Sequence, residues 1–188
     1  MSRRTETPGA ATTRDLLCAA AMAEFNDHGF AGTDTNRIAR RAGFAPQTFY
    51  RWYKDKTEVF VAAYRAWEDE EKDTVQGLVA RDAPVEALVE AGIAHHQRYL
   101  KFRRSLRQLS LENPVVRAAR AESRLRQIAQ IGAWAGRPAE IGQTAVRLLQ
   151  MERLSDAVAE GELADMGLSE AEARAELARI VAALRGGA

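Results

Sequence analysis

Apolar residues recur every three or four positions along most of this chain, and that spacing predicts helices nearly throughout. The first helix should run from a capping pair, Thr12 with Asp15, to a stop signal at His28-Gly29. Its apolar face consists of Leu17, Ala21 and Phe25. No stretch alternates apolar and polar residues as a half-buried strand does, so the pattern indicates an all-α fold.

Three further helix starts follow. A second, short helix is expected after Thr33 or Asp34, either of which can cap it, and it should end at Gly43. A third short helix opens at Ala45-Pro46, because proline fits the first helical turn, where its missing N–H is not needed. Asp55 with Glu58 forms a capping pair for a fourth helix.

Two short helices joined by the turn at residues 42–45, with a longer helix before them, are typical of a helix-turn-helix. In that motif the second helix enters the major groove of DNA. Charge supports this interpretation: the whole chain has a formal net charge of +1, yet residues 36–56 contain six basic residues and one acidic residue. Residues 149–188 contain eight acidic residues and four arginines, so the positive field is concentrated around the turn.

The remainder of the chain changes character after Gly77, where alanine-rich helical segments replace the aromatic and basic composition. Helix-breaking residues divide these segments at 82–84, 113–114, 137–138 and 166–167. In the segment that follows the first break, residues at helical spacing form one stripe that contains a glycine and polar side chains. A helix face buried in a hydrophobic core would have leucine at these positions. The stripe consists of Leu88, Gly92, His96, Tyr99 and Arg103.

Metal, disulfide and membrane chemistry have little support. The single cysteine, Cys18, cannot form an internal disulfide. It lies next to the apolar face of the first helix and is expected to be a packing residue, with oxidant sensing as the alternative. Residues 68–73, EDEEKD, point their carboxylates in different directions and are expected to form a solvated face. Adjacent His95 and His96 lack the spacing of a zinc site. Uncharged runs are too short to span a membrane, so we expect a cytoplasmic, nucleoid-associated protein with no metal or cofactor.

The stretch FNDHGFAGTDTNRIARRAGFAPQTFYRWYKDKTEVF resembles the N-terminal DNA-binding module of TetR-family transcriptional regulators. It shares that family's order of signals: a phenylalanine and a glycine at the helix end, a threonine-rich cap, Ile-Ala-x-x-Ala-Gly, and an aromatic cluster followed by lysine. The resemblance covers roughly residues 13–64. Two departures bear on DNA recognition. Ala45 stands where the family often has a capping Ser or Thr, and Phe49 and Trp52 replace the usual Leu and His or Tyr.

The resemblance implies a set of DNA contacts. Gln47 and Thr48 are expected to read base edges, the glutamine pairing with adenine and the threonine methyl touching thymine. Asn36 is the other candidate base reader, and Arg51 suits either a base or a phosphate. The further candidates for DNA contact, in which the aromatic and lysine side chains suit phosphate and sugar, are Pro46, Tyr50, Trp52, Lys54 and Lys56. The alternative is an ordinary solvated basic face over core aromatics.

These patterns divide the chain into three regions. Residues 1–12 form a polar arm that is expected to be disordered, although Arg3 and Arg4 could enter a minor groove. Residues 13–56 form the helix-turn-helix DNA-binding domain. Residues 57–188 form a helical domain that the resemblance assigns to effector binding and dimerisation.

A ligand pocket enclosed by helices of the second domain is implied by the resemblance. Such sites combine apolar walls with a few placed polar groups. The candidate lining residues are Trp67, His96, Tyr99, Arg103 and Trp134, with Phe102 as a weaker choice. The alternative for each of them is hydrogen-bonded structure without a ligand.

Two C-terminal segments are expected to pair with those of a second subunit as a four-helix bundle, again as the resemblance implies. One leads from Ile141 through Leu149 toward Val158, and the other carries a stripe from Ala173 to Leu184 after a capping pair, Ser169 with Glu172. The alternative is that this stripe belongs to the core of a single chain. A two-fold dimer would place two recognition helices about one DNA turn apart or more, on a near-palindromic operator.

We therefore expect an all-α homodimeric transcriptional regulator. It would repress by binding double-stranded operator DNA, and a small-molecule effector would release it by favouring an arrangement that no longer matches the half-site spacing. The rival is a DNA-binding regulator or architectural protein without an effector. An all-α enzyme is the alternative from another class, but neither a Ser-His-Asp order nor metal-ligand spacing supports it.

Overall fold

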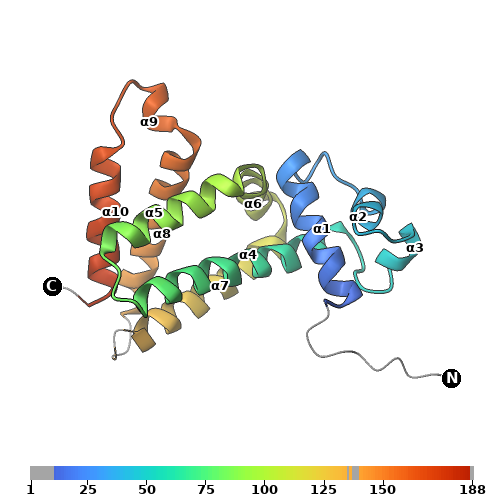
Figure 1. Cartoon of the computed structure of the whole chain (residues 1–188), viewed down its shortest axis with the longest axis horizontal. Coiled ribbons are helices and arrows are strands. Elements are labelled where there is room, and N and C mark those ends of the chain that lie inside the picture. The colour runs from blue at the N-terminus through green and yellow to red at the C-terminus, as the bar shows by residue number, and fades with distance from the viewer. Residues whose placement is uncertain (1–10, 135, 137–139, 187–188) are drawn as a thin grey trace.

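The computed structural model describes residues 11–134, 136 and 140–186, which form ten helices and no strand (Figure 1). The helices are α1 Thr13–His28, α2 Thr35–Arg41, α3 Pro46–Phe49, α4 Lys56–Val79, α5 Val85–Arg98, α6 Leu100–Glu112, α7 Pro114–Trp134, α8 Ile141–Glu160, α9 Glu162–Asp165 and α10 Ala171–Leu184. The all-helical prediction is confirmed. Arg3 and Arg4 of the predicted arm and the predicted break at 137–138 lie outside the described residues.

Local capping chemistry places the N-terminal helices where the sequence predicts them. At the start of α1, Thr12 Oγ1 accepts a hydrogen bond from the Asp15 amide, and the Asp15 carboxylate accepts one from the Thr12 amide. Asp34 accepts from the Arg37 amide at the start of α2. Asp55 caps α4 in the same way.

Two glycines make the turns of the N-terminal domain possible. Gly43, between α2 and α3, has a φ of +78°, a conformation that glycine adopts without steric cost. Gly32, in the turn after α1, approaches the backbone so closely that a Cβ atom would lie 2.4 Å from the carbonyl oxygen of His28. A side chain at Gly32 would therefore force this turn apart.

A first hydrophobic cluster joins the N-terminal helices to the middle of the chain. The ring of Phe60 on α4 lies 5.0 Å from that of Phe25 on α1 and 5.0 Å from that of Phe102 on α6. All three side chains are fully buried. Because α4 is one continuous helix, this core crosses the boundary that the sequence places between residues 56 and 57.

A second cluster lies at the far end of the molecule, where α5, α8 and α10 pack together (Figure 1). The apolar stripe of α10 contributes Ala173 and Leu177 to it, and Val158 comes from α8. The apolar stripe of α10, which is a predicted dimer contact, thus lies within the core of the chain. The predicted capping pair before α10 is also absent, since Ser169 Oγ accepts instead from the Ala171 amide.

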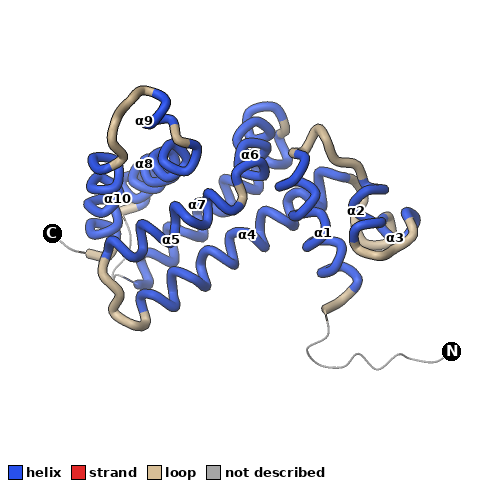
Figure 2. The backbone as a smooth tube through the Cα atoms, turned by 45° about the horizontal axis from the view of Figure 1, so that its top comes forward, coloured by secondary structure: helices blue, strands red, loops and turns tan. Residues whose placement is uncertain are grey.

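Two helix breaks were not predicted correctly. The chain turns at Tyr99 between α5 and α6, as the path of the backbone shows (Figure 2), although neither glycine nor proline stands there. The second lies at Gly161, which adopts the left-handed conformation and ends α8. The break expected at 166–167 is present, because α9 ends at Asp165 and Gly167 has a φ of +71°. The first of these breaks redirects α6 toward α1.

Candidate functional site

The short helix α3 is fixed to the N-terminal domain by its inward side chains. Phe49 and Tyr53 are buried, and the Tyr53 hydroxyl donates a hydrogen bond to the carbonyl oxygen of Arg14 on α1 at 3.2 Å. Burial raises the pKa of Tyr53 to about 12, so the phenol stays neutral and remains a donor. These contacts hold the opposite edge of α3 outward on a rigid support.

Most of the predicted DNA contacts lie on α3 and in the turn that follows it. Asn36, Gln47, Arg51 and Lys54 are exposed, and their side chains make no hydrogen bond within the described part of the chain. Further predicted contacts also lie at this surface, namely Pro46 and Thr48, which are half-buried, and Tyr50 and Trp52, which are 59% and 44% exposed. Tyr50 shares a hydrogen bond of 3.0 Å with the Thr35 hydroxyl. These exposed side chains are therefore free to meet bases and phosphates.

The positive field around this surface is smaller than the sequence count suggests. The carboxylate of Glu24, which is buried on α1, pairs with Arg37 at 2.9 Å and with Arg41 at 3.1 Å. Burial opposes ionisation of Glu24, but the two guanidinium groups outweigh it and lower its pKa. Arg41 also pairs with Asp27. These two arginines therefore brace α2 against α1.

Lys56 has a structural role that the sequence did not predict. Its ammonium donates hydrogen bonds of 2.8 Å to the carbonyl oxygens of Phe30 and Thr33, and it lies 4.1 Å from the centre of the Phe30 ring. Burial lowers its pKa. Two of its three N–H donors are thus used within the chain, and Lys56 holds the turn between α1 and α2.

We expect Lys56→Met to lower the free energy of unfolding by about 1–3 kcal/mol, because two partly buried carbonyl oxygens lose their donor. Lys54→Met is the matched control, because Lys54 is exposed and its ammonium has no partner in the described part of the chain. It should change stability by less than about 0.5 kcal/mol. Urea denaturation of both variants measures the difference, and equal losses would show that Lys56 is not a structural residue.

The helix α6 connects this domain to the rest of the molecule. Ser105 Oγ accepts a hydrogen bond from the Phe30 amide at 2.9 Å, and Lys101 donates to the Asp27 carbonyl oxygen at 2.7 Å. Asn26 on α1 donates to the carbonyl oxygen of Arg98. A displacement of α6 would therefore move α1 and the turn after it.

A cavity of about 330 Å³ lies between α4, α5, α7, α8 and α10. Four of the five predicted pocket residues line it: Trp67, His96, Arg103 and Trp134. Trp134 is 44% exposed. Tyr99 lies apart from the cavity, because the helix break turns its hydroxyl to the Glu70 carboxylate at 2.6 Å. Phe102 is buried in the first cluster instead.

Two buried residues of this lining, His96 and Arg103, pair with the same carboxylate. Asp156 Oδ1 lies 2.9 Å from His96 Nδ1, and Arg103 Nη2 lies 3.0 Å from both carboxylate oxygens. Burial by itself would raise the pKa of Asp156, but the hydrogen bond from His96 and the charge of Arg103 lower it to about 2. Arg103 also stacks on Trp67, with its guanidinium carbon 4.8 Å from the ring centre.

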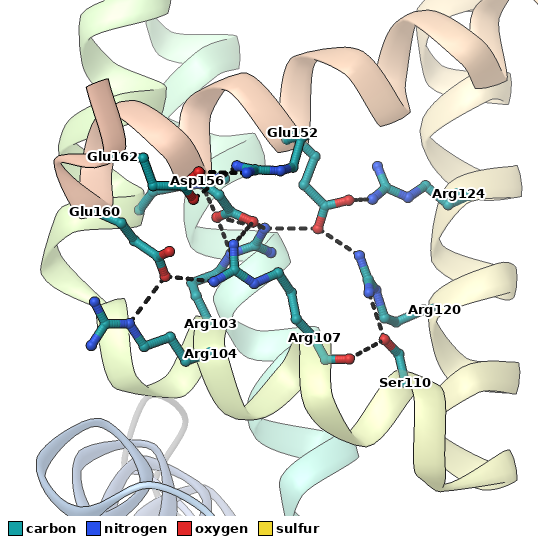
Figure 3. Close-up of polar contacts among 12 residues, drawn as sticks. Arg103, Arg104, Arg107, Ser110, Arg120, Arg124, Glu152, Asp156, Glu160 and Glu162 are labelled. Atoms are coloured by element: carbon teal, nitrogen blue, oxygen red, sulfur yellow. Dashed lines mark hydrogen bonds and ion pairs between the residues drawn. The ribbon is translucent and has the colours of Figure 1, made fainter. Parts of the chain in front are cut away.

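Asp156 belongs to a larger polar network that the sequence analysis missed (Figure 3). Three carboxylates spaced four residues apart on α8 face arginines of α6 and α7. The acids are Glu152, Asp156 and Glu160, and the arginines are Arg103, Arg104, Arg107, Arg120 and Arg124. The recurring four-residue spacing of the acids is the sequence signal that would have revealed this face.

Several other predicted features take a different place in the structure. Part of the acidic run 68–73 is not a solvated face, because Glu68 pairs with Arg126 and Glu71 lies 3.7 Å from His96. Cys18 packs half-buried against the first cluster, and burial raises the pKa of its thiol. In the described ranges, no group of three or more His, Cys, Asp or Glu residues is placed to hold a metal, and no helix is long and apolar enough to cross a membrane.

Residues 17–63 match the sequence model of a family described as bacterial regulatory proteins, tetR family. No curated protein matches the chain. Several solved structures share its fold. A candidate transcriptional regulator of Streptomyces coelicolor A3(2) aligns with a TM-score of 0.68 and 20% identity over 90% of this chain and 98% of its own.

Two further structures extend the comparison. A candidate TetR-family regulator of a Rhodococcus species gives a TM-score of 0.69 and 19% identity over 92% of this chain and 98% of its own. The fatty acid degradation regulator FadR of Bacillus halodurans gives a TM-score of 0.61 and 18% identity, with 98% of both chains covered. At these identities the similarity shows a shared fold.

Proposed function

Because its N-terminal domain belongs to the TetR family of bacterial regulatory proteins and its fold is found in TetR-family regulators, we propose that this DNA-binding regulator is a repressor released by a small molecule. The exposed outer edge of α3 supports DNA binding most directly. Gln47 and Arg51 are free of intramolecular side-chain partners in the described part of the chain, while Phe49 fixes the helix from beneath. Base readers need such pre-organised and unoccupied donors and acceptors.

The cavity favours a small-molecule effector over a regulator that lacks one. Its wall includes Arg103 on α6, and two residues later Ser105 binds the turn after α1. A ligand that favours one position of α6 therefore has a continuous path of contacts to the DNA-binding domain. Such a ligand shifts the equilibrium only by its difference in affinity for the two states, typically about 1–3 kcal/mol.

Dimerisation through the C-terminal helices is part of the proposal. Since the apolar stripe of α10 lies inside the chain, the proposed contact is the outer face of α8, where Ile141, Val146 and Leu149 are exposed. Exposed alanines on the neighbouring α10, such as Ala175, leave room for a partner helix. A two-fold pair of this kind would place two copies of α3 on one duplex.

The function is tested by selecting bound duplexes from a random pool at a stated salt concentration. We expect a near-palindromic site whose half-sites lie about 10 base pairs, or a multiple of one turn, apart. Leu149→Glu should convert the dimer to a monomer in sedimentation velocity, because it places charge in the contact, and it should bind single half-sites only. Leu111→Glu makes the same change on α6, at a position that is 76% exposed, and is the control.

Enrichment of no sequence would contradict regulation through operator recognition. A monomeric wild-type protein, or a Leu149→Glu variant that remains dimeric, would instead contradict the proposed contact on α8 while leaving DNA recognition intact. The two parts of the proposal can therefore fail separately.

A further inference from the structure

The lining of the cavity is specific enough to define the chemistry of its ligand, given the effector role proposed above. Much of the wall on the side of α5 and α10 is aliphatic and includes Leu88, Val89, Leu177 and Val181. Gly92 on α5 faces open space, because a Cβ atom built there would meet nothing within 4 Å. At about 330 Å³, the cavity lies near the lower end of the usual range for ligand pockets, roughly 300–1,000 Å³.

Three charges of the wall, those of the buried Arg103 and the half-buried Arg124 and Glu68, are already neutralised within the chain. Arg103, which is 3% exposed, pairs with Asp156, and Arg124 pairs with Glu152. Glu68 is paired with Arg126 on the neighbouring α7.

A charged group placed beside these pairs would have to separate one of them or stay without a counter-ion, and both routes carry a large desolvation cost. The basic lining residues without an ion pair in the described part of the chain, Lys72 and Arg185, are half-buried and exposed. The buried part of the wall therefore favours an uncharged head group.

Uncharged polar atoms on the opposite wall lack partners. In the described part of the chain, Trp67 Nε1 on α4 and Gln127 Oε1 on α7 are buried and have no hydrogen-bond partner. Ser123 Oγ, one helical turn before Gln127, is in the same situation. All three residues line the cavity. The indole N–H is a donor only and the amide oxygen is an acceptor, so this wall offers one group of each kind.

We propose that the cavity binds an uncharged amphipathic molecule with a carboxamide-like head, which combines an acceptor and a donor, and an aliphatic body. The acceptor of the head takes the indole N–H of Trp67, and its donor meets Gln127 Oε1. The aliphatic body lies against the apolar wall near Leu88 and Leu177. Satisfying buried polar atoms that otherwise have no partner contributes affinity that an ester or a hydrocarbon cannot match.

Calorimetric titration of the full-length protein with octanamide, octanoate and octylammonium tests the ligand class, because the three probes share one apolar chain. We expect octanamide to bind at least about tenfold more tightly than either ion, because Arg103, Arg124 and Glu68 are already paired and neither ion finds a free counter-charge beside them. Gln127→Met should weaken octanamide binding about fivefold or more. Gln97→Met makes the same change at an exposed position and should leave binding unchanged.

A second variant fills the cavity without touching the polar groups. Gly92→Leu places a side chain in the open space beside α5, and leucine is favoured over glycine in a helix, so the fold should be retained. We expect this variant to lose octanamide binding at least about tenfold, since its side chain occupies the place of the aliphatic body. Thermal denaturation without ligand checks that the variant is folded.

Three results would overturn this ligand class: tighter binding of octanoate or octylammonium, binding that Gln127→Met leaves unchanged, or no binding of octanamide to the wild type. None of them concerns DNA, so each is distinguishable from a failure of the proposed function. Selective binding of octanamide without any loss of operator affinity would instead leave the ligand class standing and contradict effector release.

Discussion

Gln47→Ala/Thr48→Ala should lose operator recognition while it retains general affinity for DNA. Each good base contact discriminates by about 1–3 kcal/mol, so removing both should lower operator affinity roughly hundredfold or more. Gln47 is exposed and has no intramolecular side-chain partner in the described residues, so its loss leaves the support of α3 in place. Phosphate contacts remain in the variant, and its affinity for a scrambled duplex should therefore stay close to that of the wild type.

The comparison is made by titrating the selected operator and a scrambled duplex at several salt concentrations. Lys54→Met provides the contrast. It should weaken binding to both duplexes alike and reduce the slope of log affinity against log salt concentration by about one. Thermal denaturation of the double variant controls for folding, because Thr48 is half-buried. An unchanged ratio between operator and scrambled DNA would show that the outer edge of α3 does not read the sequence.

Asp156→Ala is expected to be the most destabilising single substitution in the polar network. It removes the shared partner of Arg103 and His96, both of which are buried. Breaking a buried pair costs about 3–5 kcal/mol. Arg103 keeps its pair with Glu152 at 2.7 Å, so we expect a loss at the lower end of that range.

Arg103→Met/Asp156→Leu should recover part of the loss, since both buried charges are removed together. Urea denaturation of the single and double variants measures the coupling energy between Arg103 and Asp156. A loss of unfolding free energy below about 1 kcal/mol in Asp156→Ala would contradict the prediction.

The same carboxylate predicts how stability depends on pH. The pKa of Asp156 is about 2 in the folded chain, below the ordinary value of 3.8, so the folded state releases this proton more readily than the unfolded state. The stabilisation, roughly 2 kcal/mol, is present above about pH 5 and is lost as the pH falls toward 2. The wild type should therefore lose more stability than Asp156→Ala between pH 5 and 2. Parallel curves would show that this carboxylate titrates normally.

Sequence reasoning located the helix starts of the N-terminal domain because their signals are local. Thr12 with Asp15, Asp34 and Asp55 each satisfy an amide three residues away, and this geometry needs no other part of the fold. The turn at Gly43 follows from the same local logic, since its backbone conformation favours glycine.

The break at Tyr99 had no such signal. The chain leaves α5 there because α6 packs against α1, where Phe102 enters the first cluster and Ser105 binds the Phe30 amide. These partners are more than 70 residues away in sequence. Local propensity is too weak to predict a break that long-range packing imposes.

The sequence by itself determined that this protein is helical, where its first helices begin, and which residues of α3 carry a chemistry suited to DNA. Only the tertiary structure decided which charges remain free. Lys56, a predicted DNA contact, donates hydrogen bonds to two backbone carbonyl oxygens. Arg103 lines the cavity, but its charge is already paired with Asp156. Helix formation and capping depend on residues three or four positions apart, whereas burial and ion pairing depend on groups that meet only after the helices pack.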